Sequence, residues 1–88
     1  MFVAIYHEIH DREQFKQKVN AMAPPPQELR RHQFFTATDL SRAACLWEAP
    51  SVDDLRDYID GSLVPASTQT YFAVNERRAV GLPESQPA

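Results

Sequence analysis

The chain has 88 residues, a formal net charge of −3 and a single cysteine, a size that predicts one small domain. Its acidic balance argues against a general nucleic-acid binder, which usually carries a basic face. Because no segment approaches about eighteen apolar residues and no signal-peptide pattern is evident, we expect no membrane span and no signal peptide. A single cysteine excludes an internal disulfide and fits a reducing cytoplasm.

The first predicted elements are a strand and a helix. Residues 2–9 are rich in β-branched and aromatic side chains, which favours a strand. Asp11 is the expected N-cap of a helix, with Gln14 at the capping-box position. Three consecutive prolines at 24–26 end this helix, because proline lacks the backbone N–H and restricts the residue before it. The apolar stripe of the helix, at i, i+4 and i+7, consists of Phe15, Val19 and Met22.

Two strands and a second helix are predicted next. Residues 29–38 and 43–49 are strand-like, and the turn residues TDLSR between them predict a hairpin. Pro50 closes the second of these strands, and Ser51 caps the helix that follows. Gly61 is expected to end that helix in a left-handed conformation. The apolar stripe of this helix consists of Val52, Leu55, Tyr58 and Ile59.

A fourth strand is predicted over residues 68–80, followed by a flexible tail over residues 81–88 that offers little for a core. The element order is then β-α-β-β-α-β, which is the split β-α-β arrangement of the ferredoxin-like fold. We therefore predict an α+β domain over residues 1–80. It should have a four-stranded antiparallel sheet, two helices on one face, and the first strand between the third and the fourth.

The second face of the predicted sheet has no helix left to cover it. If this face met water, the strands would alternate apolar and polar residues, but both sides of the first, third and fourth strands are apolar. In the first strand, one side has Phe2, Ala4 and Tyr6, and the other has Val3, Ile5 and Ile9. We expect the bare face to meet the same face of a second copy, giving a homodimer with a space between the two sheets.

The segment CLWEAPSVDDLRDYI, after the hairpin FFTATDLSR, resembles the dimeric α/β-barrel superfamily. Within it, the chain is most similar to a small bacterial family of unknown function that is related to a nickel-binding protein. The resemblance covers residues 1–80 and is most specific at Glu48, Ala49 and Pro50. It implies a dimeric α/β barrel with a cleft. It implies no single reaction, because the superfamily includes cofactorless monooxygenases, isomerases and pure binding proteins.

His7 is the first candidate for a functional group. Residues three apart in a strand point to opposite faces, so His7 and His10 cannot bind one metal ion together. His7 shares its face with Val3 and Ile5, where it is either a hydrogen-bonded core histidine or a group that projects into a cavity. Its ordinary pKa of about 6.5 suits proton transfer to or from a substrate.

Glu48 and Tyr71 are candidate partners of His7. They lie in the strands expected on either side of it, and the three would form a polar cluster if the register brings them to one face. We predict a catalytic role for these three residues, and a cavity beside His7 that suits a small apolar or aromatic molecule. The predicted lining of this cavity is Val3, Ile5 and Trp47.

The cationic segments at residues 30–32 and 77–78 leave two alternatives. They could form an anion site, or they could be solvated edge positions that discourage association of sheet edges. The second interpretation is the more common one, and we adopt it here.

Three classes of function remain. We predict a small dimeric ligand-binding or accessory protein. The alternative is a cofactorless monooxygenase or isomerase acting on a small apolar or aromatic molecule, and the third class is nickel-type metal binding with His7 or His32 and carboxylates. The chain has no Gly-rich phosphate loop, C-x-x-C pair or H-E-x-x-H motif, so we expect no cofactor and assign no metal ligand.

Overall fold

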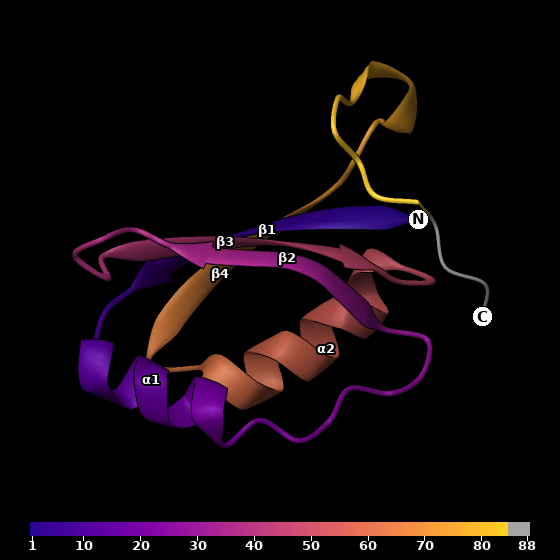
Figure 1. The fold of residues 1–88 in the computed structure, drawn as a ribbon. Coiled ribbons are helices and arrows are strands. Elements are labelled where there is room, and N and C mark those ends of the chain that lie inside the picture. The colour runs from indigo at the N-terminus through magenta and orange to yellow at the C-terminus, as the bar shows by residue number, and fades with distance from the viewer. Residues whose placement is uncertain (85–88) are drawn as a thin grey trace.

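The structure is a computed structural model that describes residues 1–84, and it has the predicted α+β architecture (Figure 1). The strands pair antiparallel in the order β2-β3-β1-β4, which fits the ferredoxin-like fold and confirms the predicted place of the first strand. Of the predicted tail, residues 81–84 contain no helix or strand, and residues 85–88 lie outside the described residues. The elements are β1 (Phe2–Ile9), α1 (Arg12–Asn20), β2 (Arg30–Thr36), β3 (Arg42–Glu48), α2 (Val52–Leu63), β4 (Ser67–Ala73) and the 3-10 helix η1 (Glu76–Arg78).

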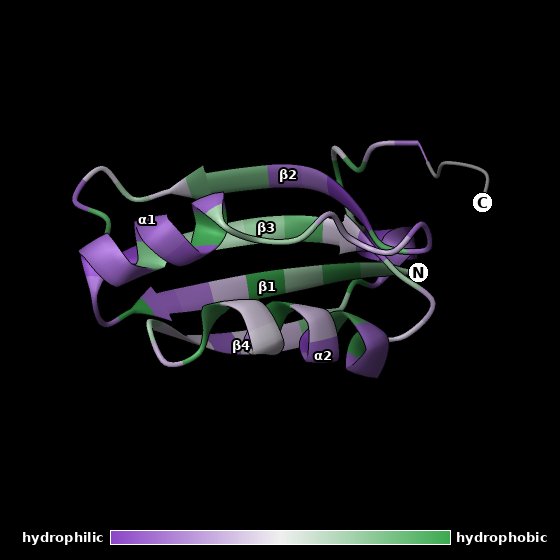
Figure 2. Ribbon diagram, turned by 90° about the horizontal axis from the view of Figure 1, so that it is seen from below, coloured by the Kyte–Doolittle hydropathy of each residue, from purple (hydrophilic) through white to green (hydrophobic). Residues whose placement is uncertain are grey.

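Both helices lie against one face of the sheet, as predicted (Figures 1 and 2). Each begins at its expected cap: Asp11 Oδ1 accepts a hydrogen bond from the backbone N–H of Gln14 at 2.9 Å, and Ser51 Oγ accepts one from Asp54 at 3.1 Å. These bonds satisfy backbone donors that a helix leaves unpaired in its first turn. The core between helices and sheet is apolar and includes Val3, Ile5, Phe15, Cys45, Trp47, Leu55, Ile59 and Leu63.

Both helices end at residues other than the predicted ones. α1 ends at Asn20, so Met22 lies beyond the helix whose stripe it was expected to complete. α2 continues through Gly61, because Leu63 extends the apolar stripe by a turn and is only 3% exposed. The helix stops at Val64, whose extended backbone is the conformation expected of a residue before proline.

The fourth strand is shorter than predicted. β4 ends at Ala73, which pairs with Val3 at the start of β1. Beyond it, the side chain of Asn75 accepts a hydrogen bond from the backbone N–H of Arg77 at 3.2 Å. This local bond competes with strand pairing and favours the short helix η1 instead.

The face of the sheet opposite the helices, called the open face below, exposes large apolar side chains. Tyr6, Phe35 and Phe72 are 41%, 60% and 58% exposed on it. In Figure 1 the segment after β4 rises above one end of this face. The apolar second face predicted from the strand pattern is therefore confirmed. Smaller apolar residues at open-face register positions are Ala4, Ala44 and Leu46.

Candidate functional site

The structure divides the predicted site residues between the two faces of the sheet. Glu48 points to the open face, where its Oε1 lies 3.1 Å from Nε2 of His32. The register explains the separation: Glu48 is opposite Phe2 at one end of β1, whereas His7 is opposite Ala43 near the other end. The structure therefore does not bring Glu48 into one cluster with His7 and Tyr71. The predicted residues on the helix side are Val3, Ile5, His7, Trp47 and Tyr71.

His7 is a buried side chain with both ring nitrogens in contact with polar partners. It is 1% exposed, its Nδ1 lies 3.3 Å from Oε1 of Gln69, and its Nε2 lies 3.1 Å from Sγ of Cys45. The indole N–H of Trp47 donates to the same sulfur at 3.2 Å. No buried side-chain N or O among residues 1–84 lacks a hydrogen-bond partner, so the polar groups in this part of the core are satisfied.

The chemistry of these partners fixes where the protons lie. An amide oxygen only accepts, so Nδ1 of His7 carries the proton that points to Gln69. An indole N–H only donates, so the Cys45 sulfur accepts from Trp47 and its own proton is directed to Nε2 of His7. Burial lowers the pKa of His7 below its usual range, which agrees with a neutral ring. Burial also raises the pKa of the Cys45 thiol to about 11, so it stays protonated at neutral pH.

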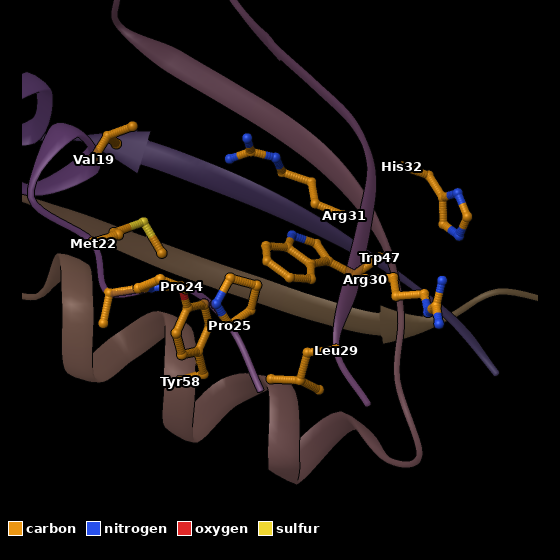
Figure 3. Close-up of a pocket in the computed structure, with 11 residues that line it drawn as sticks. Val19, Met22, Pro24, Pro25, Leu29, Arg30, Arg31, His32, Trp47 and Tyr58 are labelled. Carbon is orange, nitrogen blue, oxygen red and sulfur yellow. The ribbon is translucent and has the colours of Figure 1, made fainter. Parts of the chain in front are cut away.

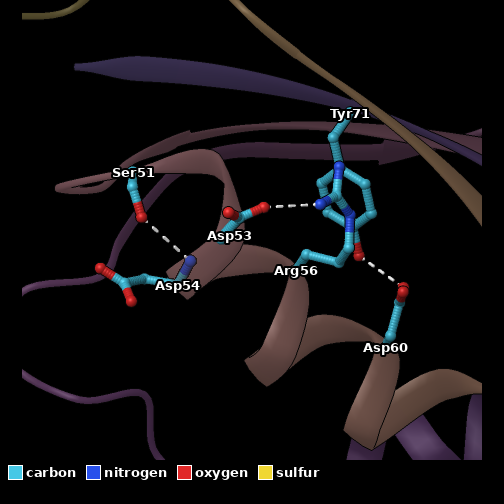
Figure 4. A network of polar contacts seen from close by, with 6 residues as sticks. All are labelled: Ser51, Asp53, Asp54, Arg56, Asp60 and Tyr71. Carbon is cyan, nitrogen blue, oxygen red and sulfur yellow. Dashed lines mark hydrogen bonds and ion pairs between the residues drawn. The ribbon is translucent and has the colours of Figure 1, made fainter.

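The hydrogen bonds continue from Gln69 to α2. Gln69 Nε2 donates to Oδ1 of Asp60 at 3.0 Å, and the hydroxyl of Tyr71 donates to the same oxygen at 2.6 Å. Figure 4 shows Arg56 against the Tyr71 ring, with its guanidinium carbon 5.1 Å from the ring centroid. Burial, and after it the bond to Asp60, raises the pKa of Tyr71. Tyr71 therefore acts here as a hydrogen-bond donor that orients Asp60.

We expect acid to destabilise the protein through His7. The unfolded chain takes up a proton on this histidine as the pH falls through about 6.5, whereas burial opposes protonation in the folded state. The unfolded state then binds more protons, so the free energy of unfolding decreases as the pH is lowered below about 6.5. Urea titrations at several pH values should show the stability advantage of wild type over His7→Gln shrinking between neutral pH and pH 5.

His10 provides the control for this titration, because it is an exposed histidine whose Nε2 contacts Oγ1 of Thr68. The stability difference between wild type and His10→Gln should change less over the same range. A constant difference between wild type and His7→Gln would contradict the neutral, buried state assigned to His7.

The space beside His7 is small. Its volume is about 20 Å³, which is room for about one water molecule. Trp47 lines this space, but Val3 and Ile5 are buried in the apolar core away from it. A small organic molecule therefore does not fit beside His7, and the catalytic role predicted for this residue has no substrate space next to it in this conformation.

A much larger groove, of about 660 Å³, lies on the helix side of the molecule. We call it the proline-loop groove, because the loop that joins α1 to β2 and carries Pro24 and Pro25 forms part of its wall (Figure 3). The rings of Trp47 and Tyr58 meet edge to face inside it, with centroids 6.0 Å apart. Its other apolar lining residues are Val19, Met22, Ala23 and Leu29.

The proline-rich loop is fixed near both of its ends. At one end, the hydroxyl of Tyr58 donates to the backbone oxygen of Ala23. At the other, the side chain of Leu29 is buried in the core, and its N–H donates to the oxygen of Pro26 at 2.9 Å. These contacts hold the loop in front of the core and leave the groove between them.

Sequence reasoning missed this groove because it considered its parts separately. The prolines were interpreted only as a helix stop, and for residues 30–32 the solvated-edge interpretation was preferred to an anion site. The available signal was their combination: a stiff proline run that leads directly into a strand beginning with three cationic or titratable side chains.

The groove is cationic although the chain carries a net negative charge. Its lining includes Arg30, Arg31 and His32 but no Asp or Glu. Arg31 is opposite Trp47 in the register and lies on the same side of β2, whereas Arg30 and His32 lie on the other side (Figure 3). The guanidinium carbon of Arg31 is 5.5 Å from the ring centroid of Phe34. Arg31 is therefore the cation that faces the aromatic part of the groove.

Residues 1–84 contain neither a candidate metal site nor a candidate membrane-spanning helix. In this part of the chain, no group of three or more His, Cys, Asp or Glu side chains is placed to hold a metal ion. None of its helices combines the length and the apolar character that crossing a membrane requires. Nickel-type binding thus has no candidate ligand set within the described residues of one copy.

No protein-family model, no curated protein and no solved structure matches this chain. The observed strand order fits the ferredoxin-like architecture that the resemblance implied, but a family membership and a link to a nickel-binding protein gain no support. The candidate function therefore depends on the geometry of the groove and of the open face.

Proposed function

We propose that this protein is a homodimer that binds a small apolar or aromatic molecule in the proline-loop groove. The groove itself is the observation that supports this function. Its volume of about 660 Å³ falls within the range of about 300–1,000 Å³ that is usual for small-molecule sites. Its walls combine aromatic and aliphatic side chains with Arg30, Arg31 and His32, so the groove offers apolar contact together with positive charge.

Binding is better supported than catalysis. The alternative, a cofactorless monooxygenase or isomerase, would use His7 as general base with Glu48 or Tyr71 orienting the substrate. Both ring nitrogens of His7 already have partners, and the space next to it holds about one water molecule. Glu48 lies on the opposite face of the sheet. A binding role requires none of these groups to react.

The open face supports the homodimer. Tyr6, Phe35 and Phe72 are large, exposed and on one surface, and apolar patches of this kind usually mark an interaction site. A small chain gains core by self-association, because alone it buries only about 60–65% of its unfolded surface. The aromatic part of the groove, with Trp47 and Tyr58, lies on the other side of the sheet, so a dimer formed in this way leaves that part of both grooves accessible.

The free cysteine fits a reducing cytoplasm.

The binding function is tested with a neutral fluorescent probe, 2-naphthalenemethanol, in isothermal titration calorimetry. Wild type should bind it, and Ala23→Phe should weaken binding by at least about tenfold, because Ala23 lines the groove and a phenyl group there would fill it. Gln27→Phe is the matched control, since Gln27 is an exposed residue of the same loop that does not line the groove.

Two outcomes would contradict this function. One is the absence of any binding of the probe to wild type. The other is equal affinity in wild type and Ala23→Phe, which would place the bound probe elsewhere on the molecule.

A further inference from the structure

We infer that the natural ligand of the proline-loop groove is a carboxylic acid with an apolar or aromatic body, and that Arg31 binds its carboxylate. This inference rests on the proposed function, because it names the chemical class of the molecule bound in that groove.

The first observation is that Arg31 lacks an acidic partner within the described chain. Ion pairs in residues 1–84 include those of Lys16 with Glu13, His32 with Glu48 and Arg56 with Asp53, and none of these includes Arg31. No Asp or Glu lines the groove. Opposite charges favour each other most where water is partly excluded, so an anionic ligand supplies the partner that the chain does not.

The second observation is the position in which Arg31 is held. Its guanidinium lies over the ring of Phe34, with the carbon 5.5 Å from the ring centroid. A cation–π contact engages the charge of the guanidinium without using up its N–H donors. These donors form the planar fork that binds both oxygens of a carboxylate. The contact with Phe34 therefore places Arg31 beside the groove and leaves its N–H donors for a ligand.

The third observation is that Arg31 is close enough to the aromatic residues of the groove for its charge to act on neighbouring side chains. Burial raises the pKa of Tyr58, and the positive charge of Arg31 opposes this rise. The same charge acts on Cys45, which is bonded to Trp47 below the groove. In Figure 3 Arg31 lies on one side of the Trp47 ring, and Tyr58 with Pro25 lies on the other. A ligand that spans the groove meets a cation at one end and an apolar wall at the other.

A carboxylate fits this arrangement better than a phosphate. Arg30 and His32 lie on the other side of β2 (Figure 3), and His32 already contacts Glu48 at 3.1 Å. One guanidinium suits a singly charged, planar group. Phosphate sites commonly add a glycine-rich loop, and the chain has only two glycines, Gly61 and Gly81, neither of which lines the groove.

Two probes of similar shape, one charged and one neutral, separate the contribution of charge to binding from that of apolar contact. We compare 2-naphthoic acid, which is ionised at neutral pH, with neutral 2-naphthalenemethanol by isothermal titration calorimetry. Wild type should bind the acid at least about tenfold more tightly than the alcohol. Arg31→Gln should lose this preference and bind both probes with the affinity of the alcohol, and Arg31→Lys should keep part of it.

Arg77→Gln is the matched control, because Arg77 is an exposed arginine of η1 outside the groove, and it should keep the full preference. Circular dichroism checks that each variant remains folded. Equal binding of acid and alcohol by wild type, or an unchanged preference in Arg31→Gln, would overturn the assignment of a carboxylate while leaving the proposed function in place. Binding of neither probe would instead contradict the proposed function itself.

Discussion

Replacing Phe35 and Phe72 together with aspartate is expected to convert the proposed homodimer into single copies. Both side chains lie on the open face and are more than half exposed in one copy, so a face-to-face dimer would bury them. In a two-fold interface each substitution occurs twice, which places four carboxylates where four phenyl rings were. We expect the dissociation constant to rise by at least about a hundredfold. Sedimentation equilibrium over a range of protein concentrations measures it.

Val64→Asp is the control for this variant, because Val64 is a similarly exposed apolar residue, at 51%, that follows α2 on the helix side. It should leave the dissociation constant unchanged. Far-ultraviolet circular dichroism should show that both variants keep the fold. Wild type that remains a single folded copy at all concentrations tested would rule out the homodimer, and a variant that still dimerises would place the interface elsewhere.

Replacing Trp47 with alanine is expected to lower the free energy of unfolding by about 3–5 kcal/mol. Trp47 is 3% exposed, its ring packs against Tyr58, and its N–H donates to Cys45. Its removal leaves a cavity at the base of the proline-loop groove. The loss is a large fraction of the total of about 5–15 kcal/mol that is usual for folded proteins. Urea unfolding followed by circular dichroism measures it.

Trp47→Phe separates the two contributions of this residue. It keeps an aromatic ring beside Tyr58 and removes only the larger ring system and the N–H bonded to Cys45. We expect it to recover more than half of the stability lost in the alanine variant. A loss below about 1 kcal/mol for Trp47→Ala would be typical of a surface position and would contradict the packing described for it.

Local sequence patterns were sufficient for the first three strands, the helix caps and the apolar open face. The caps Asp11 and Ser51 could be predicted because each capping hydrogen bond joins residues only three apart in the sequence. The end of α2 was predicted wrongly, since glycine weakens a helix but does not stop it when Leu63 can still be buried one turn later. Short-range chemistry thus determines where an element begins more firmly than where it ends.

The candidate site depends on contacts that no local pattern carries. Whether Glu48 shares a face with His7 is decided by the register, and a shift of one residue would reverse the answer. β2 has such a shift between Arg31 and Gln33, which changes the face of the residues beyond it. The groove likewise depends on a bond from Tyr58 to Ala23, residues that are far apart along the chain.

The buried position of Cys45, with its hydrogen bonds to His7 and Trp47, should protect it from thiol reagents. Such reagents attack the thiolate, but this sulfur is buried and its pKa is raised to about 11. Modification must therefore wait for β3 to separate transiently from the helices. The rate at which Cys45 is labelled therefore reports how often this local opening occurs. A molecule bound over Trp47 would slow the labelling, so the single cysteine can be used to measure local opening of the domain.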